Sequence, residues 1–180
     1  MPAPATPEAR AWLGLGTNLG ERAENLRAGL AGLARLGRIE AVSSVYETEP
    51  IGYREQPDFW NLAVRLVTRL DPAALLSAAL AIETAQGRTR PFHHAPRTLD
   101  IDLLLYDDLV LAEPELVLPH PRLAERAFVL ELLAELDPEL AHPVTHARMA
   151  EMARVPGLGR VTRLFPGAGL LPGSSNPDLQ

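Results

Sequence analysis

The fold is decided most strongly by one stretch, Pro96-Arg97-Thr98-Leu99-Asp100-Ile101-Asp102-Leu103-Leu104-Leu105. It sets two carboxylates two residues apart in a segment that is otherwise apolar enough to be a buried strand. Side chains alternate along a strand, so Asp100 and Asp102 are predicted to share one face and the apolar residues between them the other. Two strand steps span roughly 6.6 Å, so both carboxylates can reach one cation or a pair of cations.

The two aspartates need a positive partner. Burying two unpaired carboxylates would cost on the order of several kcal/mol, so we expect a cation beside them. One interpretation is a structural cluster with Arg97, which lies close by in the sequence. The other is Mg²⁺, which binds through one or two carboxylates together with substrate phosphates. The second interpretation makes the Asp-x-Asp pair a hypothesis of phosphate chemistry.

The composition excludes several classes of chemistry. All 17 basic residues are arginine, and without lysine neither a P-loop lysine, a protein-kinase lysine nor a Schiff base is possible. Cysteine is absent, which excludes disulfides, thiolate zinc sites and cysteine nucleophiles. The net charge of −6 argues against a nucleic-acid partner, because such partners usually meet a basic face.

The chain reads as one domain. Its 180 residues are enough for a single core. We expect a flexible N-terminus over 1–10, a single domain over 11–154, and a Gly/Pro-rich extension over 155–180 that is irregular or loosely attached. The first ten residues lack the plan of a signal peptide, and the longest apolar runs are too short to span a membrane. The expectation is a cytoplasmic monomer without a membrane partner.

The order of elements predicts the fold class. Apolar patterns predict strands over 11–15, 39–46, 59–67 and 99–105. They predict helices over 26–36, with Gly37 as a C-terminal cap, and over 72–86, with Asp71 as the N-cap before Pro72. This strand, helix, strand, strand, helix, strand order predicts an α+β protein with a ferredoxin-like core, an antiparallel sheet and helices in three layers. A further helix is predicted over 122–136, and the stretch 88–96 is predicted to be a basic, mobile loop.

Six motifs in order resemble the 6-hydroxymethyl-7,8-dihydropterin pyrophosphokinase family of the folate pathway, from about Trp12 to Leu140. One motif alone would be weak, whereas six in the same order are specific. The matching pieces are Gly14-Leu15-Gly16-Thr17-Asn18-Leu19-Gly20, Ser44-Val45-Tyr46-Glu47-Thr48, Gln56-Pro57-Asp58-Phe59-Trp60-Asn61, Gln86-Gly87-Arg88-Thr89-Arg90, Pro96-Arg97-Thr98-Leu99-Asp100-Ile101-Asp102, and Leu118-Pro119-His120-Pro121 with Arg126 and Phe128.

The resemblance implies transfer of pyrophosphate from ATP to the hydroxymethyl oxygen of the dihydropterin, with AMP as the other product. It implies two Mg²⁺ ions on Asp100 and Asp102. The pterin would stack between two aromatic residues, with an amide reading its edge and a nearby loop completing the pocket. The substrate-binding positions implied in this way are Thr48, Ile51, Phe59, Asn61 and Phe128.

The resemblance also implies a set of residues around ATP: Glu83, Arg88, Arg90, His93, His94, Arg97, His120 and Arg126. Among these, Arg88 and Arg97 are implied to be catalytic together with Asp102. Two departures concern this side of the site. The basic loop is one residue shorter than in some members and carries His93 and His94 where those have Arg-Trp, and Pro121 stands where some have tyrosine.

Two competing hypotheses come from the same residues. A small nucleotidyltransferase also uses a turn such as Gly16-Thr17 with an Asp-x-Asp pair, but it leaves Asn61 and the phenylalanines unexplained. A ferredoxin-like regulator without catalysis would make the aspartates an ion cluster with Arg97. Dependence of nucleotide binding on Mg²⁺ separates the regulator from an enzyme.

Overall fold

The computed structural model describes residues 7–87, 95–154 and 159–174. Its centre is a six-stranded antiparallel sheet, and two short strands pair separately. The sheet strands are β1 (Ala9–Thr17), β2 (Gly37–Val42), β3 (Ser44–Thr48), β4 (Phe59–Thr68), β5 (Asp100–Tyr106) and β8 (Val161–Pro166); the separate pair is β6 (Leu111–Ala112) and β7 (Val117–Leu118). The order across the sheet is β5-β1-β4-β3-β8, and β2 pairs with β4 next to β3.

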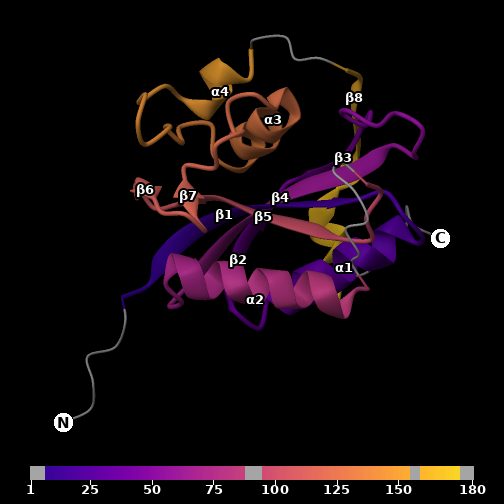
Figure 1. Cartoon of the computed structure of the whole chain (residues 1–180), viewed down its shortest axis with the longest axis horizontal. Coiled ribbons are helices and arrows are strands. Elements are labelled where there is room, and N and C mark those ends of the chain that lie inside the picture. Colours follow the sequence, from indigo (N-terminus) through magenta and orange to yellow (C-terminus); the bar gives the residue numbers. More distant parts are fainter. Residues whose placement is uncertain (1–6, 88–94, 155–158, 175–180) are drawn as a thin grey trace.

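Helices cover both faces of this sheet (Figure 1). One face carries α1 (Arg22–Leu33) and α2 (Pro72–Ala85), and the other carries α3 (Ala127–Leu136) and the short α4 (Met149–Met152). The molecule is therefore an α+β protein with an antiparallel sheet, as the sequence predicts. None of its described helices is long and apolar enough to cross a membrane.

Alternation along the strands produces two cores. On β4, Leu62 and Val64 face the core under α1 and α2, whereas Ala63 faces the core under α3. On β5, Ile101 and Leu103 join the first core. The assignment on β5 confirms the faces predicted from the sequence, because the pleat sends successive side chains to opposite sides. The predicted N-cap is also confirmed, since the backbone N–H of Ala74 donates to the Asp71 carboxylate at 2.8 Å.

The segment after α1 differs from the prediction. Gly37 does not cap the helix, which ends at Leu33; it begins β2 opposite Thr68. A Cβ at Gly37 would collide with the carbonyl oxygen of Val67, so glycine is required there for close approach of two strands. The single strand predicted over 39–46 is two strands, β2 and β3, that both pair with β4.

The break between β2 and β3 lies at Ser43. Its hydroxyl accepts from the backbone N–H of Ala63 at 2.8 Å, and its carbonyl accepts from Gly167 at 3.1 Å. At this break the Ser43 hydroxyl and the backbone of Gly167 thus form hydrogen bonds in place of the regular strand-to-strand ones. The third helix is also shorter than predicted: residues 122–125 form turns, Arg126 is extended, and α3 begins only at Ala127.

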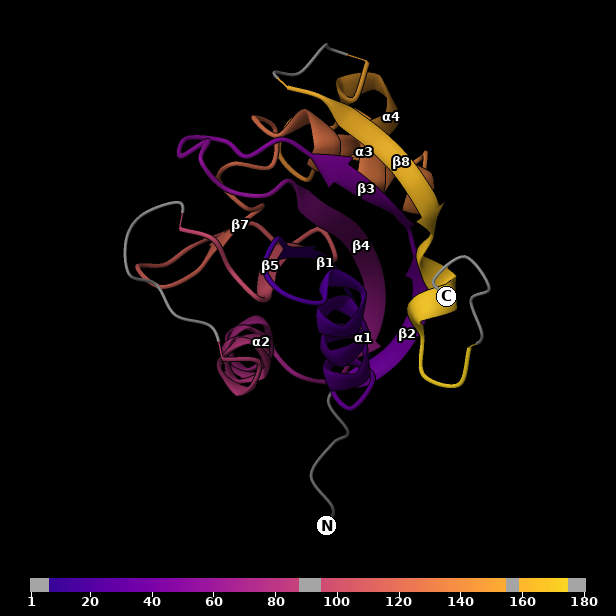
Figure 2. The ribbon, with the colours of Figure 1, turned by 90° about the vertical axis from the view of Figure 1, so that its right-hand side faces the viewer.

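The C-terminal segment is the largest correction. The sequence predicts an irregular extension after residue 154, but β8 pairs with β3 and continues the curved sheet (Figure 2). It is followed by a 3₁₀ turn, η1 (Gly167–Leu170), whose Leu170 is buried in the main core. At the other end, β1 begins at Ala9, within the segment predicted to be a flexible terminus. Local composition gave a wrong prediction for both ends of the chain, because strand pairing and burial there depend on residues far away in the sequence.

Candidate active site

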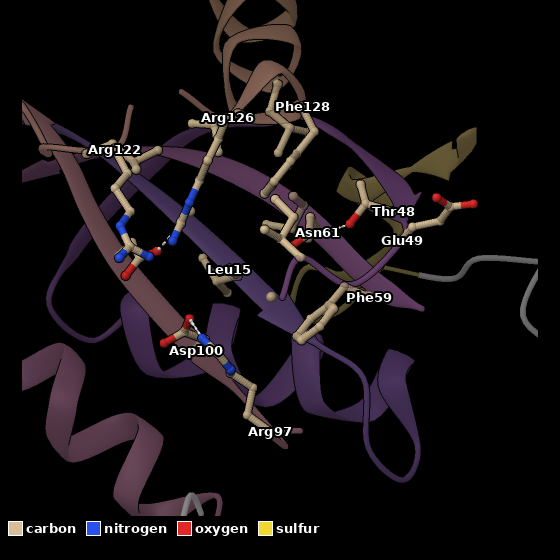
Figure 3. A pocket seen from close by; sticks show the side chains of 18 of the residues that line it. Leu15, Thr48, Glu49, Phe59, Asn61, Arg97, Asp100, Arg122, Arg126 and Phe128 are labelled. Atoms are coloured by element: carbon tan, nitrogen blue, oxygen red, sulfur yellow. Dashed lines mark hydrogen bonds and ion pairs between the residues drawn. The ribbon is translucent and has the colours of Figure 1, made fainter. Parts of the chain in front are cut away.

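A pocket of about 380 Å³ opens between the start of α3 and the neighbouring ends of β1, β3, β4 and β5 (Figure 3). One end of it carries acidic and basic side chains, and the other carries aromatic and amide side chains. The lining residues are Gly14, Leu15, Gly16, Thr48, Glu49, Ile51, Gln56, Phe59, Asn61, Leu62, Arg97, Asp100, Asp102, Leu104, Arg122, Glu125, Arg126, Phe128, Val129 and Leu132.

Both aspartates of β5 face this pocket from the same side of the strand. Each carboxylate has an arginine partner: Arg97 donates to Asp100 at 2.5 Å, and Arg126 donates to Asp102 at 3.1 Å. The Arg97 partner matches the structural interpretation of the pair. The resemblance places Arg126 near ATP, but nothing in the sequence predicts its pairing with Asp102, 24 residues away. The site therefore brings two carboxylates and two guanidinium groups together.

Burial and mutual repulsion act on these charges. Burial, and then the neighbouring Asp100 carboxylate, raise the pKa of Asp102, and Arg126 offsets only part of this. Burial also lowers the pKa of His120, although Asp102 favours its charged form. A further cation beside Asp102 would relieve the cost of its charge, because opposite charges stabilise a buried carboxylate.

The donor set suits a hard divalent cation that is completed by substrate. Among the described residues, no three or more histidine, aspartate or glutamate side chains gather closely enough to hold a metal ion by themselves. Mg²⁺ does not need such a cage, because it keeps waters and binds through one or two carboxylates plus phosphates. Asp100 and Asp102 provide those two carboxylates, so they fit Mg²⁺ bound together with a phosphate substrate.

Glu83 supports the aspartates from behind. Its side chain is buried, and it accepts from the backbone N–H of Ile101, the residue between the two aspartates, at 2.6 Å. A second hollow of about 300 Å³ lies on this side, and it is lined by Glu83, His120 and the same Asp102 that lines the first pocket. Asp102 therefore lies between two neighbouring hollows.

The other end of the pocket presents an amide between aromatic rings. Asn61 is buried, and its Nδ2 donates to the Thr48 hydroxyl at 2.8 Å. Phe59 and Phe128 lie on either side of it in Figure 3. A Cβ at Gly16 would lie only 2.9 Å from Asn61 Oδ1, so glycine there makes room for the amide. Asn61 keeps hydrogen-bonding capacity for a polar heterocycle.

Asn18 joins the strands that flank the pocket. It is buried, and its Nδ2 donates to Gln56 Oε1 at 2.8 Å and to the Pro57 carbonyl at 2.9 Å. Its Oδ1 accepts from the backbone N–H of Arg97 at 2.9 Å. One side chain thus couples the segment before β4 to the segment before β5.

Most of the described residues predicted for the site meet in this pocket: Thr48, Ile51, Phe59, Asn61, Arg97, Asp100, Asp102, Arg126 and Phe128. Glu83 and His120 line the second hollow instead. Arg88, Arg90, His93 and His94 lie outside the described residues, as does most of the predicted basic loop.

Several lining residues were missed by sequence reasoning. Gln56 lies inside a quoted motif, and Arg122 follows the Pro-His-Pro motif directly, so their positions were available as signals. Glu49 and Glu125 carry no such signal, because an isolated glutamate in a turn is usually solvated. The pocket also depends on Asn18, whose position inside the Gly14–Gly20 motif was an available signal.

An α+β domain with paired carboxylates and arginines beside an amide and aromatic rings has the features of an enzyme that transfers phosphate groups to a polar ring compound. Comparison with known proteins agrees. The model of the family described as 7,8-dihydro-6-hydroxymethylpterin-pyrophosphokinase matches residues 12–138. The chain belongs to this family, and it is accordingly a pyrophosphokinase enzyme of folate biosynthesis.

Curated relatives carry the same name. The chain is 41% identical to the 2-amino-4-hydroxy-6-hydroxymethyldihydropteridine pyrophosphokinase of Bacillus subtilis over 76% of its own length and 83% of the relative's. It is 44% identical to that of Pseudomonas aeruginosa, over 74% and 84% of the two chains. It also matches the folic acid synthesis protein fol1 of Schizosaccharomyces pombe at 38% identity, over 86% of this chain but only 22% of that longer protein.

A solved structure supports the fold. The HPPK-DHPS protein of Plasmodium falciparum, crystallised with pterin and p-hydroxybenzoate, superposes with a TM-score of 0.66 at 18% identity, over 84% of this chain and 42% of that chain. Membership of the family decides against both competing hypotheses, the nucleotidyltransferase and the regulator without catalysis.

Proposed function

We propose that the enzyme transfers the terminal diphosphate of ATP to the hydroxymethyl group of 6-hydroxymethyl-7,8-dihydropterin, and that it releases AMP. In this reaction the hydroxymethyl oxygen forms a bond to the β-phosphorus of ATP. The bond between the β-phosphorus and the oxygen bridging to the α-phosphorus breaks, AMP leaves with that oxygen, and the hydroxyl proton passes to solvent. No covalent enzyme intermediate is needed, so positioning carries most of the catalysis.

The pterin is proposed to lie at the aromatic end of the pocket. Phe59 and Phe128 offer ring faces for stacking, and the Asn61 amide offers both a donor and an acceptor to the pterin edge. Thr48 orients that amide through its 2.8 Å hydrogen bond, and Ile51 lines the same pocket. A flat heterocycle with donors and acceptors on its edge satisfies these groups together.

The triphosphate is proposed to lie at the charged end. Asp100 and Asp102 would hold two Mg²⁺ ions, which supply neutralisation of the phosphate charge during transfer. Arg97 and Arg126 are ion-paired with these aspartates, so each guanidinium lies where a phosphate oxygen can replace the carboxylate as its partner. Catalytic roles are proposed for Arg97 and Asp102 on this basis, and Arg88 is proposed to join them from outside the described residues.

The rest of ATP is proposed to occupy the second hollow beside Asp102. His120 and Glu83 line it, and its continuity with Asp102 allows one nucleotide to place its phosphates at the metal site. Burial keeps His120 neutral at pH 7, because its pKa lies below the ordinary value of 6.5. It would therefore act as a hydrogen-bonding group and not as a fixed charge. Arg90, His93 and His94, which lie outside the described residues, are proposed to contribute to ATP binding as well.

We also propose a fold class, an oligomeric state and a cellular location for this enzyme. The core is classed as ferredoxin-like, with β2 and β3 as two halves of its second strand, because the order β5-β1-β4-β3 is that of a βαββαβ unit. The protein is also proposed to act as a monomer. It is proposed to work in the cytoplasm, where a chain without cysteine needs no oxidising environment.

The observation that carries the proposal is the single pocket that joins two carboxylates to an amide between aromatic rings. The test is to incubate the full chain with ATP, Mg²⁺ and 6-hydroxymethyl-dihydropterin and to separate the nucleotides. AMP is expected in equal amount with a pterin diphosphate, and only when Mg²⁺ is present. Release of ADP or of inorganic pyrophosphate in place of AMP would contradict the proposed bond cleavage.

A further inference from the structure

The loop over residues 49–58, between β3 and β4, forms one wall of the pocket. Three of its residues, Glu49, Ile51 and Gln56, line the cavity. The loop has little core of its own, since Ile51 is 56% and Tyr53 is 41% exposed. A loop with so few buried apolar groups depends on tethers at its ends to hold one conformation.

Arg160, which lies outside the loop, contacts both of these ends. The backbone N–H of Glu49, where the loop begins, donates to the carbonyl of Arg160 at 3.3 Å. The guanidinium of the same Arg160 donates to the carboxylate of Asp58, where the loop ends, at 2.8 Å. Arg160 therefore bridges the two ends of the loop from outside the pocket, and Asn18 holds the same loop from inside.

Strand β8 places Arg160 at this point. Val161, the first residue of the strand, pairs with Thr48 of β3, which lines the pocket. Further along, Phe165 packs edge-on against Trp60 of β4, with ring centroids 5.4 Å apart. Gly159 has a φ of +95°, a conformation that favours glycine, and it brings the chain past Glu49 into the strand.

We propose that Arg160 is a positioning residue for the pterin end of the active site, and that β8, which begins at the next residue, holds it in place. The family match ends at residue 138, so this residue lies outside the part of the chain that the family model describes. The inference rests on the proposed function, because it takes the pocket beside the 49–58 loop as the pterin site. Arg160 does not line the pocket; it acts through the loop.

The expected effect is selective and modest. The Arg160 side chain is 62% exposed and its Asp58 partner 27% exposed, so the ion pair is weakened by solvent. Loss of a tether of this strength is expected to raise the KM for the pterin about three- to fivefold. The KM for ATP is expected to stay within about twofold, because the metal site is built on β5 and not on this loop.

The experiment compares Arg160, which directly precedes β8, with an arginine on the strand itself. Arg163 is 61% exposed, and its guanidinium contacts Ser44 and Glu135 instead of the 49–58 loop. The full chains of wild type, Arg160→Gln, Arg160→Lys and Arg163→Gln are assayed for kcat and for both KM values, and their thermal midpoints are recorded. Asp58→Asn and the double variant Asp58→Asn/Arg160→Gln complete a double-mutant cycle.

Support requires a raised pterin KM in Arg160→Gln and Asp58→Asn, no further rise in the double variant, and partial recovery in Arg160→Lys. Arg163→Gln should keep the wild-type pterin KM. Equal pterin KM values in Arg160→Gln and wild type would overturn the inference, and so would equal rises in Arg160→Gln and Arg163→Gln. In either case an active wild-type enzyme would leave the proposed function intact. A wild-type chain that does not bind the pterin would overturn both.

Discussion

Asp100 and Asp102 lie on one face of β5, and each is ion-paired with an arginine from a different part of the chain. Asp100 pairs with a residue three positions earlier, whereas Asp102 pairs with one beyond β7. Burial and the Asp100 charge raise the pKa of Asp102, so the folded protein carries a cost for keeping both carboxylates charged. A cost of this kind is typical of groups that bind a metal or substrate.

At the residue scale, replacing either aspartate with asparagine is expected to abolish turnover but to keep the fold. The amide is close in size, but it is a poor ligand for Mg²⁺, so we expect at least a hundredfold loss, or about 2.7 kcal/mol in the barrier. The rate of AMP formation measures this loss, and the thermal midpoint checks the fold. Turnover within about tenfold of wild type in both Asp100→Asn and Asp102→Asn would disprove the metal-ligand assignment.

At the element scale, α3 is attached to β3 through Glu135. Its carboxylate accepts from the backbone N–H of Ser44 at 2.9 Å, from the Ser44 hydroxyl at 2.8 Å and from the Tyr46 hydroxyl at 3.0 Å. Burial raises the pKa of Glu135, but these hydrogen bonds outweigh burial, and the pKa lies below its ordinary value of 4.5. Burial, and then the hydrogen bond to the Glu135 carboxylate, raise the pKa of Tyr46 to about 12.

The sign of the pH dependence follows from these directions. A carboxyl whose folded pKa is lowered contributes stability above pH 4.5, its ordinary pKa, and loses it as the pH falls through the folded pKa. Glu135→Gln is therefore expected to lower the free energy of unfolding at pH 7 by about 1–3 kcal/mol. This difference from wild type is expected to shrink below pH 4.5. Urea unfolding at several pH values measures it.

Glu131 on the same helix is the matched control. Burial raises its pKa, so its charge opposes folding at pH 7, and Glu131→Gln is expected to be at least as stable as wild type. A Glu135→Gln variant that is as stable as wild type at pH 7 would show that α3 is not attached through this carboxylate.

At the scale of the whole molecule, the C-terminal segment belongs to the main core. Leu170 is 1% exposed and lies in the same cluster as Leu26 and Leu30 of α1. Leu164, on β8 of the same segment, is 37% exposed. The sheet, α1 and η1 are therefore joined by one apolar cluster, which extends across residues far apart in the sequence.

Leu170→Ala is expected to lower the free energy of unfolding by about 2–5 kcal/mol, because it leaves a cavity in a packed core. Leu164→Ala is expected to lower it by less than about 1 kcal/mol, because the side chain already meets solvent. Urea unfolding of both variants measures the difference. Equal effects of the two substitutions would mean that the C-terminal segment is not packed as described.

The sequence by itself determined the α+β class, the face that carries Asp100 and Asp102, and the N-cap at Asp71. These features depend on short-range rules: strand side chains alternate every residue, and a capping side chain reaches only the next turn. The family motifs added most of the pocket residues, because each motif is local in the chain. Even so, the same rules misplaced Gly37, whose requirement comes from close contact with β4.

Only the tertiary structure decided which distant residues meet. The pairing of Arg126 with Asp102, the three side-chain hydrogen bonds of Asn18 and the bridge from Arg160 to both ends of the 49–58 loop join segments that no local pattern connects. Strand β8 was missed for the same reason, since an edge strand is stabilised by its neighbour and not by its own composition. Contacts between distant segments form only when the whole chain has packed, so they cannot be read from residue spacing.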